Sequence, residues 1–126
     1  MKTVMAFIRI NMMNKTKKAL SSQGISSMTA FGHCNGRGRG YWDAKVMEGI
    51  KNNEPEALAQ IGGEPRLRPQ TMIMITVPEN KAKLVVQTII DTNHTGKHGD
   101  GKIFVLPEND VIRVRTGESG YGVLDS

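Results

Sequence analysis

Apolar and polar residues alternate at the start of the chain, over residues 3–10. One side of this alternation is apolar throughout: Val4, Ala6, Ile8 and Ile10. The other side is mixed: Thr3, Met5, Phe7 and Arg9. A period of two is typical of a strand with one buried face, so this segment is predicted to be a strand.

A helix is predicted next, starting near Asn11 or Asn14, because an asparagine side chain can accept hydrogen bonds from the first free amides of a helix. The helix runs to about Gln23, and Gly24 suits the position just past a helix end. Residues 25–31 are then predicted to form a second strand.

The same order returns later in the chain. Residues 71–77 are a short apolar run that predicts a strand, and Pro78 and Glu79 suit the first turn of a helix. The apolar positions of that helix recur at helical spacing: Ala82, Val85, Val86, Ile89 and Ile90. Two further strands are predicted, at residues 102–106 and 111–115.

The predicted order is therefore strand, helix, strand, a long break, strand, helix and strand. Two such halves pack most simply as an α+β sandwich of βαββαβ type, with one antiparallel sheet and both helices on one face. A small parallel α/β fold is the alternative. It is disfavoured because two helices cannot cover both faces of a parallel sheet.

The break between the two halves, about residues 36–68, contains many glycines and prolines and little periodicity. A connection of this length inside a small domain is usually a functional loop or a flexible segment. Its basic side chains make it a candidate arm for contacting a partner: Arg37, Arg39, Lys45, Lys51, Arg66 and Arg68. A solvated insert is the alternative on pattern alone.

Composition narrows the class of protein. The chain has 126 residues, enough for one domain with its own core. The net charge of +5 suits an anionic partner, but aromatic residues are only 5% of the chain, which disfavours base stacking on a nucleic acid. Cys34 is the single cysteine, no apolar run could cross a bilayer, and no signal peptide is evident. We therefore expect a cytoplasmic protein without membrane insertion or nucleic-acid partners.

The strongest chemical signal is a glycine-rich stretch at residues 95–105. It combines glycines that can turn backbone amides toward a ligand with lysines that add charge: Gly96, Gly99, Gly101, Lys97 and Lys102. These are the components of an anion-binding loop, although no Ser or Thr follows the lysine as in a Walker sequence. His94 and His98 flank the loop without a third ligand, so no metal site is expected.

A second cationic feature follows at residues 111–115, where Arg113 and Arg115 fall on the same side of the predicted strand. Two guanidinium groups on one face are typical of a clamp for phosphate or carboxylate groups. The sequence alone does not place this clamp against the glycine-rich stretch.

Together, Thr95-Gly-Lys-x-Gly-Asp-Gly-Lys-Ile-Phe-Val105 and Ile112-Arg-Val-Arg-Thr-Gly-Glu118 closely resemble the C-terminal signature of the PII nitrogen-regulatory signal proteins. Lys17-Lys-Ala-Leu20, Gly24-Ile-x-x-Met-Thr29 and Gly36-x-Gly-Arg39 agree with the N-terminal half of that family. The resemblance implies a ferredoxin-like α+β fold, a trimer, and ATP or ADP bound in clefts between subunits. It also implies a T-loop at about residues 36–68 that contacts targets, a B-loop at about 94–102, and a C-terminal strand and tail at about 110–126.

The resemblance assigns roles to individual positions. The family's phosphate-binding B-loop falls on these residues: Thr95, Gly96, Lys97, Gly99, Asp100, Gly101 and Lys102. Arg113 and Arg115 match arginines that reach the nucleotide phosphates across the subunit interface. Positions lining the adenosine pocket match Met28 and Thr29. The base of the T-loop beside that pocket matches three residues: Gly36, Gly38 and Arg39.

Two positions depart from the family pattern. Gly40 stands where a glutamine usually helps to hold Mg²⁺ and 2-oxoglutarate, and Gln70 aligns near the lysine that usually pairs with 2-oxoglutarate. A surviving effector site must take its charge from elsewhere, and Arg37, Arg39 and Arg68 are the candidate sources. We expect 2-oxoglutarate to bind only together with ATP and Mg²⁺.

The helix start and the rearranged T-loop are similar to one branch of the family. This branch is the pair of PII-like proteins encoded beside nitrogenase genes in methanogens and some other anaerobes, and the chain resembles its second member. The similarity implies a non-enzymatic sensor of nitrogen, carbon and energy status, in a homotrimer or a mixed trimer with a PII-like paralogue. Its expected target is dinitrogenase, inhibited until 2-oxoglutarate and ATP relieve it. The alternatives are regulation of an ammonium transporter or glutamine synthetase, and a small ATP-hydrolysing or phosphotransfer enzyme that uses the same cleft.

Overall fold

The structure, a computed structural model, describes residues 1–36 and 67–124. Within these residues, four strands form one antiparallel sheet in the order β2-β3-β1-β4. The strands are β1 (Lys2–Ile8), β2 (Thr29–Gly36), β3 (Arg68–Val77) and β4 (Lys102–Pro107). The helices are α1 (Met13–Ser22) and α4 (Ala82–Asn93). Short 3₁₀ turns complete the described elements: η1 (Ile10–Met12), η2 (Glu79–Lys81) and η3 (Tyr121–Val123).

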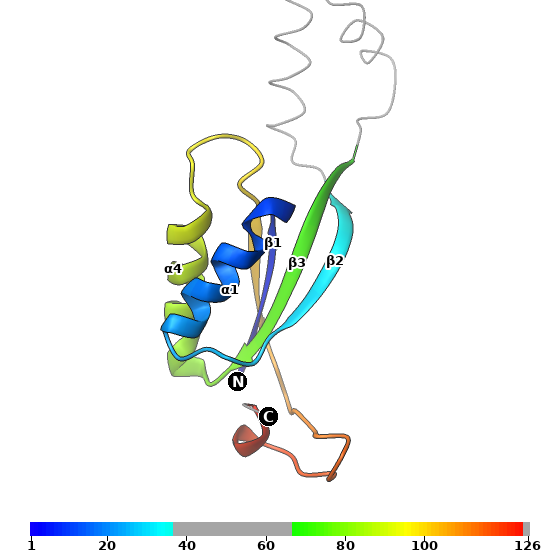
Figure 1. The fold of residues 1–126 in the computed structure, drawn as a ribbon. Coiled ribbons are helices and arrows are strands. Elements are labelled where there is room, and N and C mark those ends of the chain that lie inside the picture. Colours follow the sequence, from blue (N-terminus) through cyan, green and yellow to red (C-terminus); the bar gives the residue numbers. More distant parts are fainter. Residues whose placement is uncertain (37–66, 125–126) are drawn as a thin grey trace, which may run out of the picture.

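This order confirms the predicted α+β fold of βαββαβ type, and both helices lie on the same face of the sheet (Figure 1). The predicted arm at about residues 36–68 lies outside the described residues except at its two ends. No helix in the described part of the chain is long and apolar enough to cross a membrane.

The core lies between the helices and the covered face of the sheet. The alternation seen in the sequence places Val4, Ala6 and Ile8 of β1 on that face, each at most 1% exposed. The other strands and the helices supply the rest: Ile73, Ile75, Val77, Leu20, Val85 and Ile89, with Ile25 from the segment before β2. Burial of one such aliphatic side chain stabilises the fold by about 1.5–3 kcal/mol, so this layer accounts for the fixed sheet register.

The opposite face of the sheet carries large apolar side chains among polar ones and has no helix over it in the described residues. The strand register sets Met74, Met5 and Phe104 side by side across three strands. Phe104 packs edge to face against Phe7, with ring centroids 5.8 Å apart, and still remains 48% exposed. Phe31 of β2 is 43% exposed. A monomer therefore presents a methionine- and phenylalanine-rich surface to water.

Two strands begin at different positions from those predicted. β2 begins at Thr29 rather than Ile25, because Ile25 is buried under the helices without pairing to a neighbouring strand. β3 begins at Arg68 rather than Thr71, because its first residues pair with the far end of β2. The apolar pattern in the sequence predicts which residues are buried. Where each strand begins and ends depends instead on how far its partner strand extends.

The expected asparagine cap is wrong. Neither Asn11 nor Asn14 caps α1, whose N-cap residue is Met12 and has no side-chain hydrogen bond. The 3₁₀ turn η1 lies before α1 instead, and within it the Met12 amide donates to the Arg9 carbonyl oxygen at 3.0 Å. A turn of this kind satisfies amides that a side-chain cap would otherwise satisfy.

The expected last strand at residues 111–115 is also wrong. Only an isolated bridge between Ile112 and Ser119 forms there. The Arg113 amide donates to the Glu118 carbonyl oxygen at 2.8 Å, and the Gly117 amide donates to the Arg113 carbonyl oxygen at 2.7 Å. This turn uses backbone groups that a strand would offer to a neighbour, and it leaves Val114 99% exposed.

Candidate functional site

The glycine-rich loop, residues 94–101, connects the end of α4 to the start of β4. It crosses the end of the sheet where β1 finishes. Gly101 is the point of closest approach: a Cβ atom built there would lie 1.8 Å from the Phe7 carbonyl oxygen. Its φ of 110° is also one that side-chain-bearing residues rarely adopt. The position therefore requires glycine.

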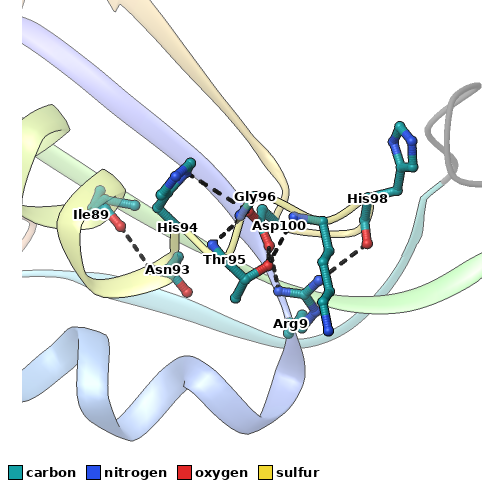
Figure 2. A network of polar contacts seen from close by, with 9 residues as sticks. Arg9, Ile89, Asn93, His94, Thr95, Gly96, His98 and Asp100 are labelled. Carbon is teal, nitrogen blue, oxygen red and sulfur yellow. Dashed lines mark hydrogen bonds and ion pairs between the residues drawn. The ribbon is translucent and has the colours of Figure 1, made fainter.

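Asp100 organises the loop from within (Figure 2). Its carboxylate accepts hydrogen bonds from the Thr95 amide at 2.8 Å, the Thr95 hydroxyl at 2.5 Å and the Gly96 amide at 3.1 Å. Arg9 donates to the same carboxylate at 2.6 Å. Partial burial alone would raise the pKa of the Asp100 carboxyl, but the hydrogen bonds from Thr95, Arg9 and Gly96 outweigh it and hold the pKa well below its usual range. Asp100 is therefore a carboxylate at neutral pH.

The loop consequently has two parts with different roles. The anchored part contains Thr95, Gly96 and Lys97, whose amides donate to acceptors inside the loop: Asp100 for the first two and the Thr95 hydroxyl for the third. The cavity-lining part contains Gly99 and Gly101, and Lys102, the first residue of β4, continues it. An anion entering the cavity meets the second part.

The cavity beside this loop has a volume of about 340 Å³. Gly36 at the end of β2 and Gln70 of β3 lie on its other side, so the structure brings these two predicted residues to the loop. A Cβ atom on Gly36 would lie 2.1 Å from Gln70 Oε1, so glycine is what leaves room for the Gln70 side chain. The remaining lining residues are Phe7, Asn35 and Phe104.

A second hollow, of about 320 Å³, lies at the opposite end of β2. It brings together three predicted residues, Met28, Thr29 and Arg113. Arg113 forms an ion pair with Glu118 at 3.4 Å. Arg115 is exposed and lines neither hollow, so within one chain the two arginines do not form a clamp on a shared strand face.

Some candidate residues lie away from these hollows or outside the described residues. Arg68 opens β3 opposite Gly36, is exposed, and is not among the residues that line either hollow. Four candidates fall outside the described residues: Arg37, Gly38, Arg39 and Gly40.

Sequence reasoning missed Arg9, Asn35 and the hydroxyls of Ser27 and Thr76 in the second hollow. Arg9 had one usable signal: it is a charged residue directly after an apolar strand. Its partner is 91 residues away in the sequence, and no local pattern identifies such a pair.

Comparisons with known proteins identify relatives of this chain. The family model described as "Nitrogen regulatory protein P-II" matches residues 1–118. The chain is 45% identical over 120 residues to the "Nitrogen fixation nifHD region GlnB-like protein 2" of Methanobacterium ivanovii, covering 95% of this chain and 96% of the relative. It is 43% identical to the protein of the same name from Methanococcus maripaludis, covering 98% and 100%. Among solved structures, it is similar to Arabidopsis thaliana PII bound to citrate, with a TM-score of 0.72, 30% identity, and coverage of 99% and 90%.

Proposed function

The chain belongs to the nitrogen regulatory protein P-II family, and on that premise we propose that it is a sensor that binds ATP or ADP and passes the signal to a target protein. One observation carries the proposal. The candidate nucleotide residues are divided between two hollows at opposite ends of β2, one with the glycine-rich loop and Lys102 and the other with Met28, Thr29 and Arg113. A nucleotide that touches both sets has to lie between two subunits.

The chemistry of each hollow suits one part of the ligand. Lys102 and the backbone of Gly99 and Gly101 suit a polyphosphate, because amides and a fixed cation share its charge. Met28 offers an apolar contact for a nucleoside and Thr29 a hydroxyl group. Arg113 and Arg115 then reach the phosphates from the neighbouring subunit.

The open face of the sheet supports the assembly that this cleft needs. Phe31 and Phe104 are more than 40% exposed in one chain, and a trimer packed on this face removes them from water. We propose a homotrimer or a mixed trimer with a PII-like paralogue. Phe104→Asp should convert the assembly to monomers in light scattering and abolish ATP binding with it. A trimer that persists unchanged in this variant contradicts the proposed interface.

The second effector is proposed to be 2-oxoglutarate. Gln70 lines the cavity beside the glycine-rich loop with a neutral amide, which cannot form an ion pair with a carboxylate. Lys102 lines the same cavity but is already assigned to the nucleotide phosphates, and Arg68 lies opposite Gly36 in the neighbouring strand. A diacid therefore needs additional positive charge, which Mg²⁺ held by ATP supplies. Calorimetry should detect binding of 2-oxoglutarate with MgATP present and none without it.

The target is proposed to be dinitrogenase, inhibited until ATP and 2-oxoglutarate relieve it. The relatives named for the nifHD region support this choice over an ammonium transporter or glutamine synthetase. Deletion of residues 41–65 should abolish inhibition in a reconstituted assay while leaving ATP affinity nearly unchanged. Continued inhibition by the deleted protein contradicts the T-loop assignment.

A regulatory role also suits the loop better than an enzymatic one. Asp100 is the acidic residue of the loop, and its carboxylate already accepts bonds from Arg9, Thr95 and Gly96. A group held in this way, with a lowered pKa, is a weak base for activating a nucleophile. We propose that the protein hydrolyses ATP at a negligible rate. We also propose that it acts in the cytoplasm.

Isothermal calorimetry tests the nucleotide site directly. Lys102→Ala should weaken ATP binding about tenfold or more, because a hydrogen bond to a charged group contributes about 1.5–3 kcal/mol. Lys18→Ala, on the exposed side of α1, is the matched control and should bind ATP as the unmodified protein does. Unchanged ATP affinity in Lys102→Ala contradicts the assignment of the phosphate site to the cavity beside the glycine-rich loop.

A further inference from the structure

Arg9 joins the end of β1 to the glycine-rich loop. Its Nη1 donates to Asp100 Oδ1 at 2.6 Å and its Nη2 donates to the His98 carbonyl oxygen at 3.1 Å (Figure 2). One guanidinium group therefore holds the loop at two points, a geometry that a single ammonium group does not reproduce.

Asp100 connects the Arg9 contacts to the backbone that lines the cavity. It lies between Gly99 and Gly101, which both line the cavity beside the loop, while its own side chain points to the anchored part of the loop. The position of the Asp100 carboxylate therefore determines the path of the backbone at Gly99 and Gly101. Arg9 is not among the residues that line the cavity.

We propose that Arg9 is a positioning residue for phosphate binding, an inference that rests on the nucleotide site proposed above. Through Asp100 and the His98 carbonyl group, it holds residues 99–102 in the shape that receives phosphate groups, before any ligand arrives. The role is exerted through the loop, since the guanidinium already has its partners there.

A simpler alternative is that Arg9 only cancels charge. A carboxylate close to a polyphosphate repels it, and a cation beside that carboxylate reduces the repulsion. The two roles differ in what Asp100→Asn does. If charge alone matters, removing the carboxylate makes Arg9 unnecessary; if position matters, the amide cannot restore the loop.

A second alternative is a general contribution to stability. The Arg9 and Asp100 side chains keep 32% and 23% of their surface exposed, and ion pairs in such positions contribute little to global unfolding. Loss of Arg9 should therefore loosen the loop and leave the unfolding midpoint nearly unchanged.

Hydrogen exchange of the free protein tests the loop without any ligand. In Arg9→Gln, the amides of Thr95 and Gly96 should exchange about tenfold faster or more, and Arg9→Lys should fall between this variant and the unmodified protein. Lys2→Gln is the matched control, because Lys2 pairs with Glu79 at 3.6 Å at the other end of β1. Unchanged loop exchange in Arg9→Gln, or equal acceleration throughout the chain, overturns the proposal.

Calorimetry with ATP supplies the second readout. Arg9→Gln should weaken ATP binding about tenfold, and Arg9→Gln combined with Asp100→Asn should bind no better than Arg9→Gln. Restoration of the original affinity in the double variant shows charge cancellation and overturns the positioning role. If the unmodified protein binds no ATP, the proposed function fails, and hydrogen exchange still decides whether Arg9 shapes the loop.

Discussion

The glycine-rich loop and the segment from residues 111–119 both carry predicted phosphate-binding residues, yet the chain holds them in different ways. The loop is closed by the Asp100 network and by the backbone contact of Gly101 with Phe7. The arginine segment is held by a local turn and by an ion pair between Arg113 and Glu118, whose side chain is 63% exposed. The first is complete within one chain. The second lies apart from the glycine-rich loop within one chain, and its proposed role needs a neighbouring subunit.

Gly101→Ala should produce the largest effect on ATP binding and stability, because Gly101 is where the glycine-rich loop packs most closely against the rest of the chain. The new Cβ atom meets the Phe7 carbonyl oxygen, and the backbone conformation resists a side chain. We expect ATP affinity to fall about a hundredfold and stability to fall by about 1–3 kcal/mol. Calorimetry and denaturant unfolding measure the two effects. Gly32→Ala, where an added Cβ meets nothing within 4 Å, is the control.

Arg115→Ala should weaken ATP binding about tenfold without altering the loop, because in the proposed cleft Arg115 is a charged partner supplied by the neighbouring subunit. Complementation sharpens this expectation. Arg115→Ala subunits mixed and reassembled with Lys102→Ala subunits form clefts that contain both intact residues, so part of the original affinity should return. No recovery in the reassembled mixture means that one subunit supplies both residues to a cleft, which contradicts the division between subunits proposed here.

The glycine-rich loop should keep its shape at neutral pH and loosen only in acid. The pKa of Asp100 in the folded protein lies below its ordinary value of 3.8, so the carboxylate stabilises the fold above about pH 4 and loses this contribution as the pH falls further. Loop exchange, corrected for intrinsic rates, should be constant from about pH 8 to 5. Asp100→Asn should differ from the unmodified protein at neutral pH and converge with it in strong acid. Equal acid sensitivity in both proteins contradicts the Asp100 assignment.

Glu118→Gln should produce the smallest effect. It removes an exposed ion pair, and such pairs contribute about 0–1 kcal/mol. The unfolding midpoint and loop exchange should both remain close to those of the unmodified protein. A large loss of stability here means that the arginine segment is held as firmly as the loop.

The sequence predicted the features that local physical chemistry determines. The alternation in β1 identified Val4, Ala6 and Ile8 as core residues, and the spacing in α4 did the same for Val85 and Ile89. Ile90 shared that spacing but is 42% exposed, since it lies at the border of the buried stripe. The glycines of the loop were found because a turn of this kind needs them.

The features that the sequence did not predict depend on contacts between distant parts of the chain. Arg9 and Asp100 meet only because β1 and β4 are neighbours in the sheet. The short alternation at residues 111–115 predicted a strand, but the Arg113–Glu118 turn satisfies the backbone there. The resemblance assigned Met28 and Gly36 to neighbouring parts of one nucleotide site, and this assignment stays a prediction. Within one chain the two residues lie near opposite ends of β2 and line different hollows, a separation that no local pattern predicts.

The position of β1 has a consequence for how the protein is made. β1 emerges first from the ribosome, yet its two neighbours in the sheet, β3 and β4, belong to the second half of the chain. The nascent strand has no partner in this sheet until β3 has followed it, and its second edge stays open until β4 is made. Such non-local pairing slows folding. The apolar residues of β1 are exposed to other nascent chains during that interval, which makes this period the one in which a chaperone has most to protect.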